Sequence, residues 1–266
     1  MHLPSCCWAS SAPVPEPMTQ RLDRIDLLRA AAMLWMTAYH FCFDLNFFGL
    51  LREDFYRDPF WTWQRTAIVS LFLLTAGLSQ AVALHQGQPW ARFWRRWLQV
   101  AGAALLVSAG SLLVFPKSFI YFGVLHGIAV MLIVARVTAG WGAWRWPLGA
   151  LMIALPFAAP PAMAAWPALE VFNSPWLNWL GFMNRKPITE DYVPLLPWMG
   201  VVWWGMAAGQ WALKQQPGWL GVAEGAATGA RRALVTLGRW SLSYYLVHQP
   251  VLMGLIWLTT TFLRAP

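Results

Sequence analysis

Four ionisable residues with helical spacing occur in the first hydrophobic run of the sequence, and they could do acid–base chemistry. Asp26, Arg29, His40 and Asp44 follow one another at intervals of three, eleven and four residues. Since an α-helix turns once in about 3.6 residues, all four lie on one helix face. A charged group that faces lipid is costly, so we expect this polar face to look into a bundle of helices. Asp26 and Arg29 are one turn apart and can pair with each other.

His40 and Asp44 have the spacing of an imidazole and the carboxylate that orients it. A carboxylate one turn away could accept a hydrogen bond from one ring nitrogen, which would leave the other nitrogen as a base. The alternative is that the four polar residues only hold neighbouring helices together. We interpret His40 and Asp44 as a catalytic pair.

Two further histidines lie in hydrophobic runs, His126 in YFGVLHGIAV and His248 in SLSYYLVHQP. Tyr244 shares a helix face with His248, four residues later. Hydrogen bonding between helices is the alternative role for both histidines. In NRKPITEDYVPLLPWMG, two prolines would hold Asp191 at the mouth of the following run, although a loop carboxylate is often just solvated. Three glycines are expected to let helices approach closely, namely Gly77, Gly123 and Gly127.

The composition shows which elements must position these side chains. Hydrophobic residues make up 58% of the chain and charged residues only 11%, and there are 20 tryptophans. The mean hydropathy is +0.46. A soluble fold could not hide so much apolar surface, whereas tryptophan favours the boundary between water and lipid. The sequence therefore predicts an all-α, polytopic transmembrane helical bundle.

Charge and cysteine content exclude several other classes of protein. The formal charge is +8, but the basic residues are scattered between apolar runs, so we expect them to set topology and expect no nucleic-acid partner. Three cysteines give no disulfide framework, and no Cys/His spacing typical of a metal site occurs, so we expect no metal. Phosphate-loop, zinc-protease and nucleophile-elbow motifs are absent from the sequence.

About seven hydrophobic runs each have close to the ~20 residues that cross a bilayer. The fifth run holds four prolines that would kink or end it, and 165–182 is expected to be an interfacial or re-entrant segment. The runs are Ile25–Leu51, Trp61–Leu84, Trp97–Phe115, Phe119–Val137, Trp144–Met163, Leu195–Leu213 and Trp240–Leu263.

The distribution of charge predicts the orientation. With the N-terminus in the cytoplasm, eleven Lys and Arg residues fall inside and seven outside, which favours an N-in, C-out arrangement. Residues 1–17 are proline-rich and lack the apolar stretch of a signal peptide. We expect 1–20 to be a disordered or misassigned N-terminal extension, and 21–266 to be a single transmembrane domain.

The motifs above, taken in order, carry a resemblance to a known family. RLDRIDLLRAAAMLWMTAYHFCFDLNFFG, FLLTAGLS, YFGVLHGIAV, DYVPLLPWMG and LGRWSLSYYLVHQP resemble segments of the bacterial heparan-alpha-glucosaminide N-acetyltransferase catalytic-domain family. Arg29 and His40 also have the arginine–histidine spacing of the wider transmembrane acyltransferases. The resemblance implies a membrane enzyme of the bacterial inner membrane that moves an acetyl or acyl group from cytoplasmic acyl-CoA to a sugar amine or hydroxyl outside.

The resemblance also implies roles for the residues singled out above. His40 would be the base, oriented by Asp44, although another histidine could take that role. Arg29, with Asp26 beside it and Arg92, Arg95 and Arg96 on the same side, would meet the CoA phosphates. The acceptor and the reacting carbonyl would be positioned by His126, Asp191, Trp198, Tyr244 and His248. No bound cofactor is expected, since acyl-CoA is a co-substrate, and the expected partners are membrane lipid, a glycan acceptor and a second copy of the chain.

Three other functions remain open on the sequence. Intramembrane His and Asp residues are equally at home in a proton-coupled transporter, which is the main alternative. Paired histidines could also ligate haem in an electron carrier. A non-catalytic assembly factor would tolerate substitution of every histidine.

Overall fold

The computed structural model describes residues 22–215 and 228–263, in which every named element is a helix. The expected N-terminal extension, 1–20, lies outside these ranges. The long helices are α1 (Asp23–Phe47), α2 (Pro59–His85), α3 (Trp90–Val114), α4 (Val124–Val137), α7 (Leu195–Gln215) and α10 (Ser241–Leu263). The all-α architecture predicted from composition is confirmed.

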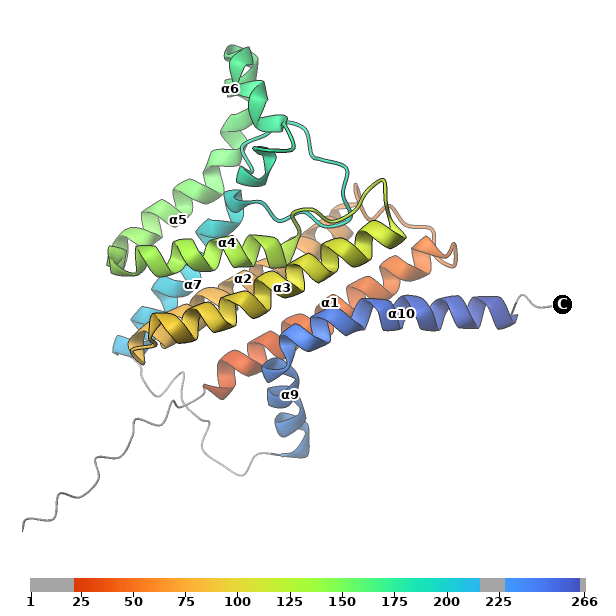
Figure 1. Cartoon of the computed structure of the whole chain (residues 1–266), viewed down its shortest axis with the longest axis horizontal. Helices are drawn as coiled ribbons and strands as arrows, with labels where there is room; N and C mark the ends of the chain where they lie inside the picture. The colour runs from red at the N-terminus through yellow and green to blue at the C-terminus, as the bar shows by residue number, and fades with distance from the viewer. Residues whose placement is uncertain (1–21, 216–227, 264–266) are drawn as a thin grey trace, which may run out of the picture.

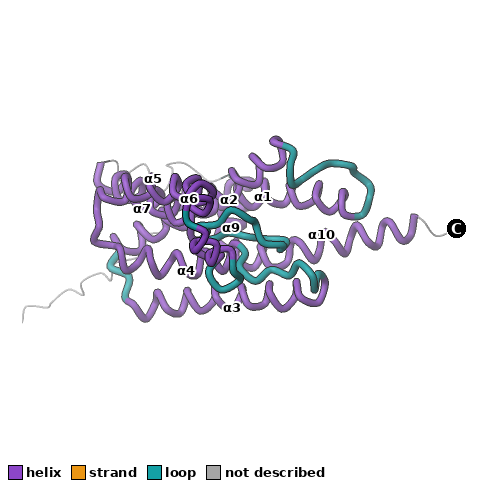
Figure 2. Tube along the Cα trace, turned by 90° about the horizontal axis from the view of Figure 1, so that it is seen from above, coloured by secondary structure: helices purple, strands orange, loops and turns teal. Residues whose placement is uncertain are grey.

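The long helices run alongside one another and form the bundle (Figure 1). Helix α2 packs most extensively against α7, and α1 contacts both α2 and α10. A short helix, α9 (Gly229–Arg239), lies steeply across the others and docks on α1. The loop from α1 to α2 and the loops before α4 and α7 lie toward the end where α10 finishes (Figure 2). The bundle therefore has one end rich in loops and an opposite end where α1 and α10 begin.

Glycines allow the closest helix crossing, as the sequence predicted. A Cβ on Gly77 of α2 would collide with the backbone carbonyl of Val202 on α7, and one on Gly205 with the carbonyl of Leu74. Gly127 lies in the same way against the Val193 carbonyl. Because small residues let helix backbones touch in lipid, Gly77 and Gly205 set the distance between α2 and α7, whereas Gly127 lets α4 approach the segment before α7.

The fourth and fifth hydrophobic runs depart from simple spans. Helix α4 begins at Val124 rather than Phe119, since the preceding residues form a loop bridged to the segment before α7 at Phe122 and Tyr192. The fifth run divides at its prolines, as predicted. It comprises α5 (Arg145–Ala154), η2 (Leu155–Ala158) and α6 (Ala159–Ala165), and the segment beyond holds only the short η3 (Pro167–Asn173) and η4 (Asn178–Leu180).

Apolar surface on the described helices is consistent with a lipid environment. Three helical stretches are long and apolar enough to cross a bilayer, Pro59–His85, Trp90–Val114 and Val124–Ala165. On α3 the exposed side chains include Leu98, Leu105 and Leu113. A water-soluble protein would bury such residues, so this is a membrane protein. The count of about seven spans and the N-in orientation stay predictions.

Candidate active site

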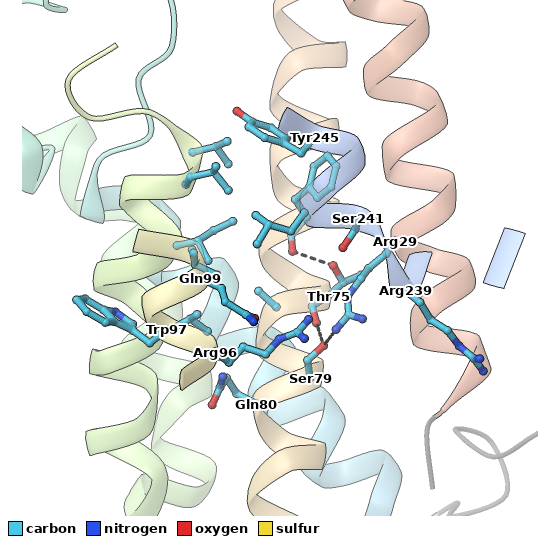
Figure 3. Close-up of a pocket in the computed structure, with 18 of the residues that line it drawn as sticks. Arg29, Thr75, Ser79, Gln80, Arg96, Trp97, Gln99, Arg239, Ser241 and Tyr245 are labelled. Atoms are coloured by element: carbon cyan, nitrogen blue, oxygen red, sulfur yellow. Dashed lines mark hydrogen bonds between the residues drawn. The ribbon is translucent and has the colours of Figure 1, made fainter. Parts of the chain in front are cut away.

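A cavity of about 570 Å³ lies inside the bundle, in the half where α1 and α10 begin. Side chains from α1, α2, α3, α4 and α10 line it, together with Arg239 and Trp240 from the junction of α9 with α10. Arg29 and Arg96 point toward each other near Ser79, and Tyr245 lies at the other end of the view (Figure 3). The cavity thus has a cationic end and an opposite end at Tyr245.

The cationic end is organised by Asp26, which is buried in α1. Its Oδ1 accepts a bond from Arg29 Nη1 at 2.8 Å, which confirms the predicted pair. Its Oδ2 lies 3.5 Å from Nε of Arg239, at the end of α9. Arg29 also donates to the Ser79 hydroxyl on α2. One carboxylate therefore holds two arginines at the wall of the cavity.

Helix α9 approaches α1 closely enough to bring Arg239 there. Gly238 lies directly against the backbone carbonyl of Asp26, where a Cβ would not fit. The Asp23 carboxylate binds Arg231 at 3.2 Å and Arg239 at 3.3 Å. The docking of a basic helix is thus fixed by two acids in the first turn of α1.

Beyond the Tyr245 end, His40 of α1 faces His248 of α10, with ring centroids 5.2 Å apart. The predicted hydrogen bond between Asp44 and His40 is not formed. Asp44 Oδ1 instead accepts from the Gln249 amide at 2.7 Å, because the packing of α10 against α1 brings this donor to it. His40, Asp44 and His248 are therefore brought together, but with a different set of contacts.

Tyr244 supports His248 from the same helix, as their spacing predicted. The two rings are stacked, 5.9 Å apart and tilted by 8°. The Thr37 hydroxyl donates to the Met33 carbonyl at 2.8 Å, so it accepts from the Tyr244 hydroxyl, which lies 2.7 Å away. This phenol is thereby anchored to α1, and it holds the plane of the His248 ring.

His126 and Asp191 meet at a different place, the beginning of α4. His126 Nε2 lies 3.0 Å from the Ser108 hydroxyl, and its Nδ1 accepts from the Gly123 amide at 3.3 Å. Asp191 Oδ2 accepts from the Val124 amide at 2.7 Å, and burial raises the pKa of this carboxyl above its usual 3.8. Neither side chain lines the described cavity. Both satisfy the first amides of a helix.

Trp198 and the three arginines at the start of α3 lie in different surroundings. Trp198 packs against the apolar core. Arg96 lines the cavity, whereas Arg92 and Arg95 do not. Among the described residues Arg96 makes no ion pair, so its charge is available to an anionic ligand.

Several cavity residues were missed in the sequence because they are neutral or lie outside the apolar runs. Tyr245 rather than Tyr244 lines the cavity, and Arg239 comes from α9. The i, i+4 spacing of Thr75 and Ser79 within a hydrophobic run was a signal that could have revealed a polar face on α2. The neutral polar lining residues are Thr75, Ser79, Gln80, Gln88, Gln99, Ser241 and Ser243.

The family model described as "Heparan-alpha-glucosaminide N-acetyltransferase, catalytic" matches residues 21–250. The chain belongs to this family. Membership in the heparan-alpha-glucosaminide N-acetyltransferase catalytic family makes it a membrane acyltransferase. No curated protein matches the chain, and no solved structure does. The cavity and the facing histidines are thus the candidate active site of an acyltransferase of this family.

Proposed function

We propose that this protein transfers an acetyl or other acyl group from acyl-CoA to an amine or hydroxyl of a sugar. The donor would enter from the cytoplasmic side of a bacterial inner membrane, and the acceptor from the opposite side. The proposal is supported by a cavity that has arginines at one end. Just beyond Tyr245 at its other end lie histidine and carboxylate atoms that have no partner among the described residues.

The cationic end suits the phosphates of CoA. Arg29, Arg96 and Arg239 line it, and guanidinium groups bind phosphate through two parallel hydrogen bonds. The volume of about 570 Å³ lies within the range of about 300–1,000 Å³ that is typical of ligand pockets. Apolar side chains such as Phe72, Val100 and Ile128 would cover the pantetheine arm as the thioester approaches Tyr245.

The histidine end suits the transfer itself. A histidine of the His40–His248 pair would take the proton of the acceptor as its nitrogen or oxygen attacks the thioester carbonyl carbon. The tetrahedral intermediate would then expel the CoA thiolate by breaking the C–S bond, and the thiolate would receive the proton back. Asp44 would hold Gln249 beside this reaction. General base catalysis of this kind accelerates a reaction by about 10²–10⁴-fold.

Asp191, Tyr192 and Trp198 lie in or directly before the start of α7, and they would contact the acceptor. Carboxylates and aromatic faces suit the hydroxyl groups and ring faces of sugars. Asp191 Oδ2 already accepts a hydrogen bond from the Val124 amide of α4, so Oδ1 would be the oxygen that it offers to the acceptor.

The experiment is an acyl-transfer assay on purified protein in proteoliposomes. Radiolabelled acetyl-CoA is supplied on one side with a panel of amino sugars and oligosaccharides on the other, and labelled sugar and free CoA thiol are measured. We expect both products in equal amounts, and a loss of at least about 100-fold on substitution of the base. Sugar counterflow without acyl-CoA and without thiol release would overturn the proposal in favour of a transporter.

A further inference from the structure

His85 is exposed at the end of α2, and the other three histidines of the described helices differ in how their ring nitrogens are occupied. His126 uses both nitrogens, one with Ser108 and one with the Gly123 amide. The Ser108 hydroxyl donates to the Ile120 carbonyl at 2.6 Å, so it accepts from Nε2–H of His126. The Nδ1 lone pair is then directed at the Gly123 amide. His126 is a capping residue with no lone pair left for chemistry.

His248 has one nitrogen occupied, and the partner fixes its tautomer. Nδ1 lies 2.7 Å from the backbone carbonyl of Tyr245. A carbonyl can only accept, so Nδ1 carries a hydrogen. A ring buried without an ion pair stays neutral, so Nε2 holds a lone pair. This Nε2 is buried and has no partner among the described residues.

Three more buried atoms around His248 lack partners in the part of the chain that the structure describes. They are His40 Nδ1, Asp44 Oδ2 and Gln249 Oε1. Buried polar atoms in proteins are almost always paired, so such atoms gathered in one place indicate that another molecule supplies the hydrogen bonds. The position between α1 and α10 is therefore built to receive a polar ligand.

His248 is also the histidine that adjoins the cavity. It follows Tyr245, which lines the cavity, by one turn of α10, and the two rings are 5.7 Å apart. His40 lies two turns beyond Met33, the last residue of α1 that lines the cavity. A thioester that reaches Tyr245 would therefore meet His248 before it meets His40.

We propose that His248 is the general base, with Nε2 taking the acceptor proton, and that His40 positions the acceptor through its unpaired Nδ1. This inference rests on the proposed acyl transfer. In the transfer, the acceptor N–H or O–H bond breaks as the new bond to the carbonyl carbon forms, and Nε2 receives the proton. When the C–S bond breaks, Nε2–H protonates the departing thiolate, and the tautomer held by Tyr245 is restored.

The test uses His248→Asn in the full-length protein. The asparagine amide can still donate to the Tyr245 carbonyl from the position of Nδ1, but nothing replaces Nε2. We expect kcat to fall by about 100-fold or more, with KM for acetyl-CoA within about twofold of wild type. In the wild type, kcat should fall at low pH because the base becomes protonated, and this fall is the acid limb of the kcat–pH profile. The residual activity of His248→Asn should lack the acid limb. His85→Asn is the matched control, since His85 is exposed at the end of α2, and it should leave kcat unchanged.

His40→Gln keeps the inference testable even if His248→Asn fails to fold. We expect this variant to raise KM for the acceptor and to retain the acid limb. If His40→Gln loses the acid limb, the assignment of the base to His248 is wrong. The assignment is also wrong if His248→Asn keeps both the acid limb and the wild-type kcat. Either result would leave the acyl transfer in place. A wild-type protein that releases no CoA thiol with any acceptor would overturn both proposals.

Discussion

The Gln249 amide on α10 donates a hydrogen bond of 2.7 Å to the Asp44 carboxylate on α1, although the two residues are 205 positions apart. Asp44 is only 1% exposed, so the bond lies inside the bundle. It ties together the two helices that carry His40 and His248. The geometry of the candidate active site therefore depends on this contact.

Replacing Gln249 with Leu should destabilise the protein, because Asp44 would be left buried without a partner. We expect a loss of about 1–3 kcal/mol in the free energy of unfolding. Thermal unfolding in detergent measures it. The double variant Asp44→Leu, Gln249→Leu is the control and should recover most of the loss, since removal of both partners can be nearly neutral. Equal stability of Gln249→Leu and wild type would contradict this account.

Arg96→Ala should weaken acyl-CoA binding, since this exposed arginine lines the cavity without an acidic partner among the described residues. Hydrogen bonds to charged groups contribute about 1.5–3 kcal/mol, so we expect KM for acetyl-CoA to rise about tenfold or more with little change in kcat. Steady-state kinetics at low salt measures the effect, because salt screens exposed charges.

Arg95→Ala is the matched control for Arg96, since this arginine is also exposed on α3 but does not line the cavity. Its KM should stay within about twofold of wild type, as is usual for a surface substitution. A similar rise in both variants would show that the charge of α3 as a whole, and not the cavity wall, attracts the donor.

Asp191→Asn should preserve the start of α4, because the amide oxygen can still accept from Val124. Asp191→Ala removes this acceptor and should lower the free energy of unfolding by about 1 kcal/mol.

Asp191→Asn also tests the pH dependence of stability. Burial raises the pKa of Asp191 above 3.8, so the folded protein holds this proton more tightly than the unfolded chain. Its contribution to stability is therefore present in acid and is lost as the pH rises from about 4 through the raised pKa.

Melting temperatures measured across that pH range should fall less in Asp191→Asn than in wild type, since asparagine does not titrate. A fall of the same size in both proteins would assign the pH dependence to other groups. If Asp191→Asn is as stable as wild type but no longer binds the acceptor, the result supports binding of the sugar by this carboxylate.

Gly77→Val should separate α2 from α7, because its side chain would meet the Val202 carbonyl. We expect a destabilisation of about 1–3 kcal/mol, which is typical of overpacking. Gly102→Ala on α3 is the control, since nothing lies within 4 Å of a Cβ there, and it should stabilise the helix by about 0.5–1 kcal/mol. A tolerated valine at Gly77 would show that the two helices can move apart without loss.

Sequence patterns alone determined those features that depend on one helix at a time. Composition established an all-α membrane protein, since lipid admits few other folds for such apolar runs. Helical periodicity placed Asp26 beside Arg29, and Tyr244 beside His248, because residues one turn apart share a helix face and need no second helix to make them neighbours. Gly77 and the prolines of the fifth run were also predicted, since their effects on close packing and on helix continuity are local.

Only the tertiary structure decided which helix faces which. The rotation and depth of α10 bring Gln249 to Asp44 and His248 to His40, and they turn Tyr245 rather than Tyr244 into the cavity. The spacing along α1 had predicted that Asp44 would bind His40, four residues away. It could not reveal a better donor about 200 residues later, because contacts between helices depend on packing of the whole bundle and not on the period of any one helix.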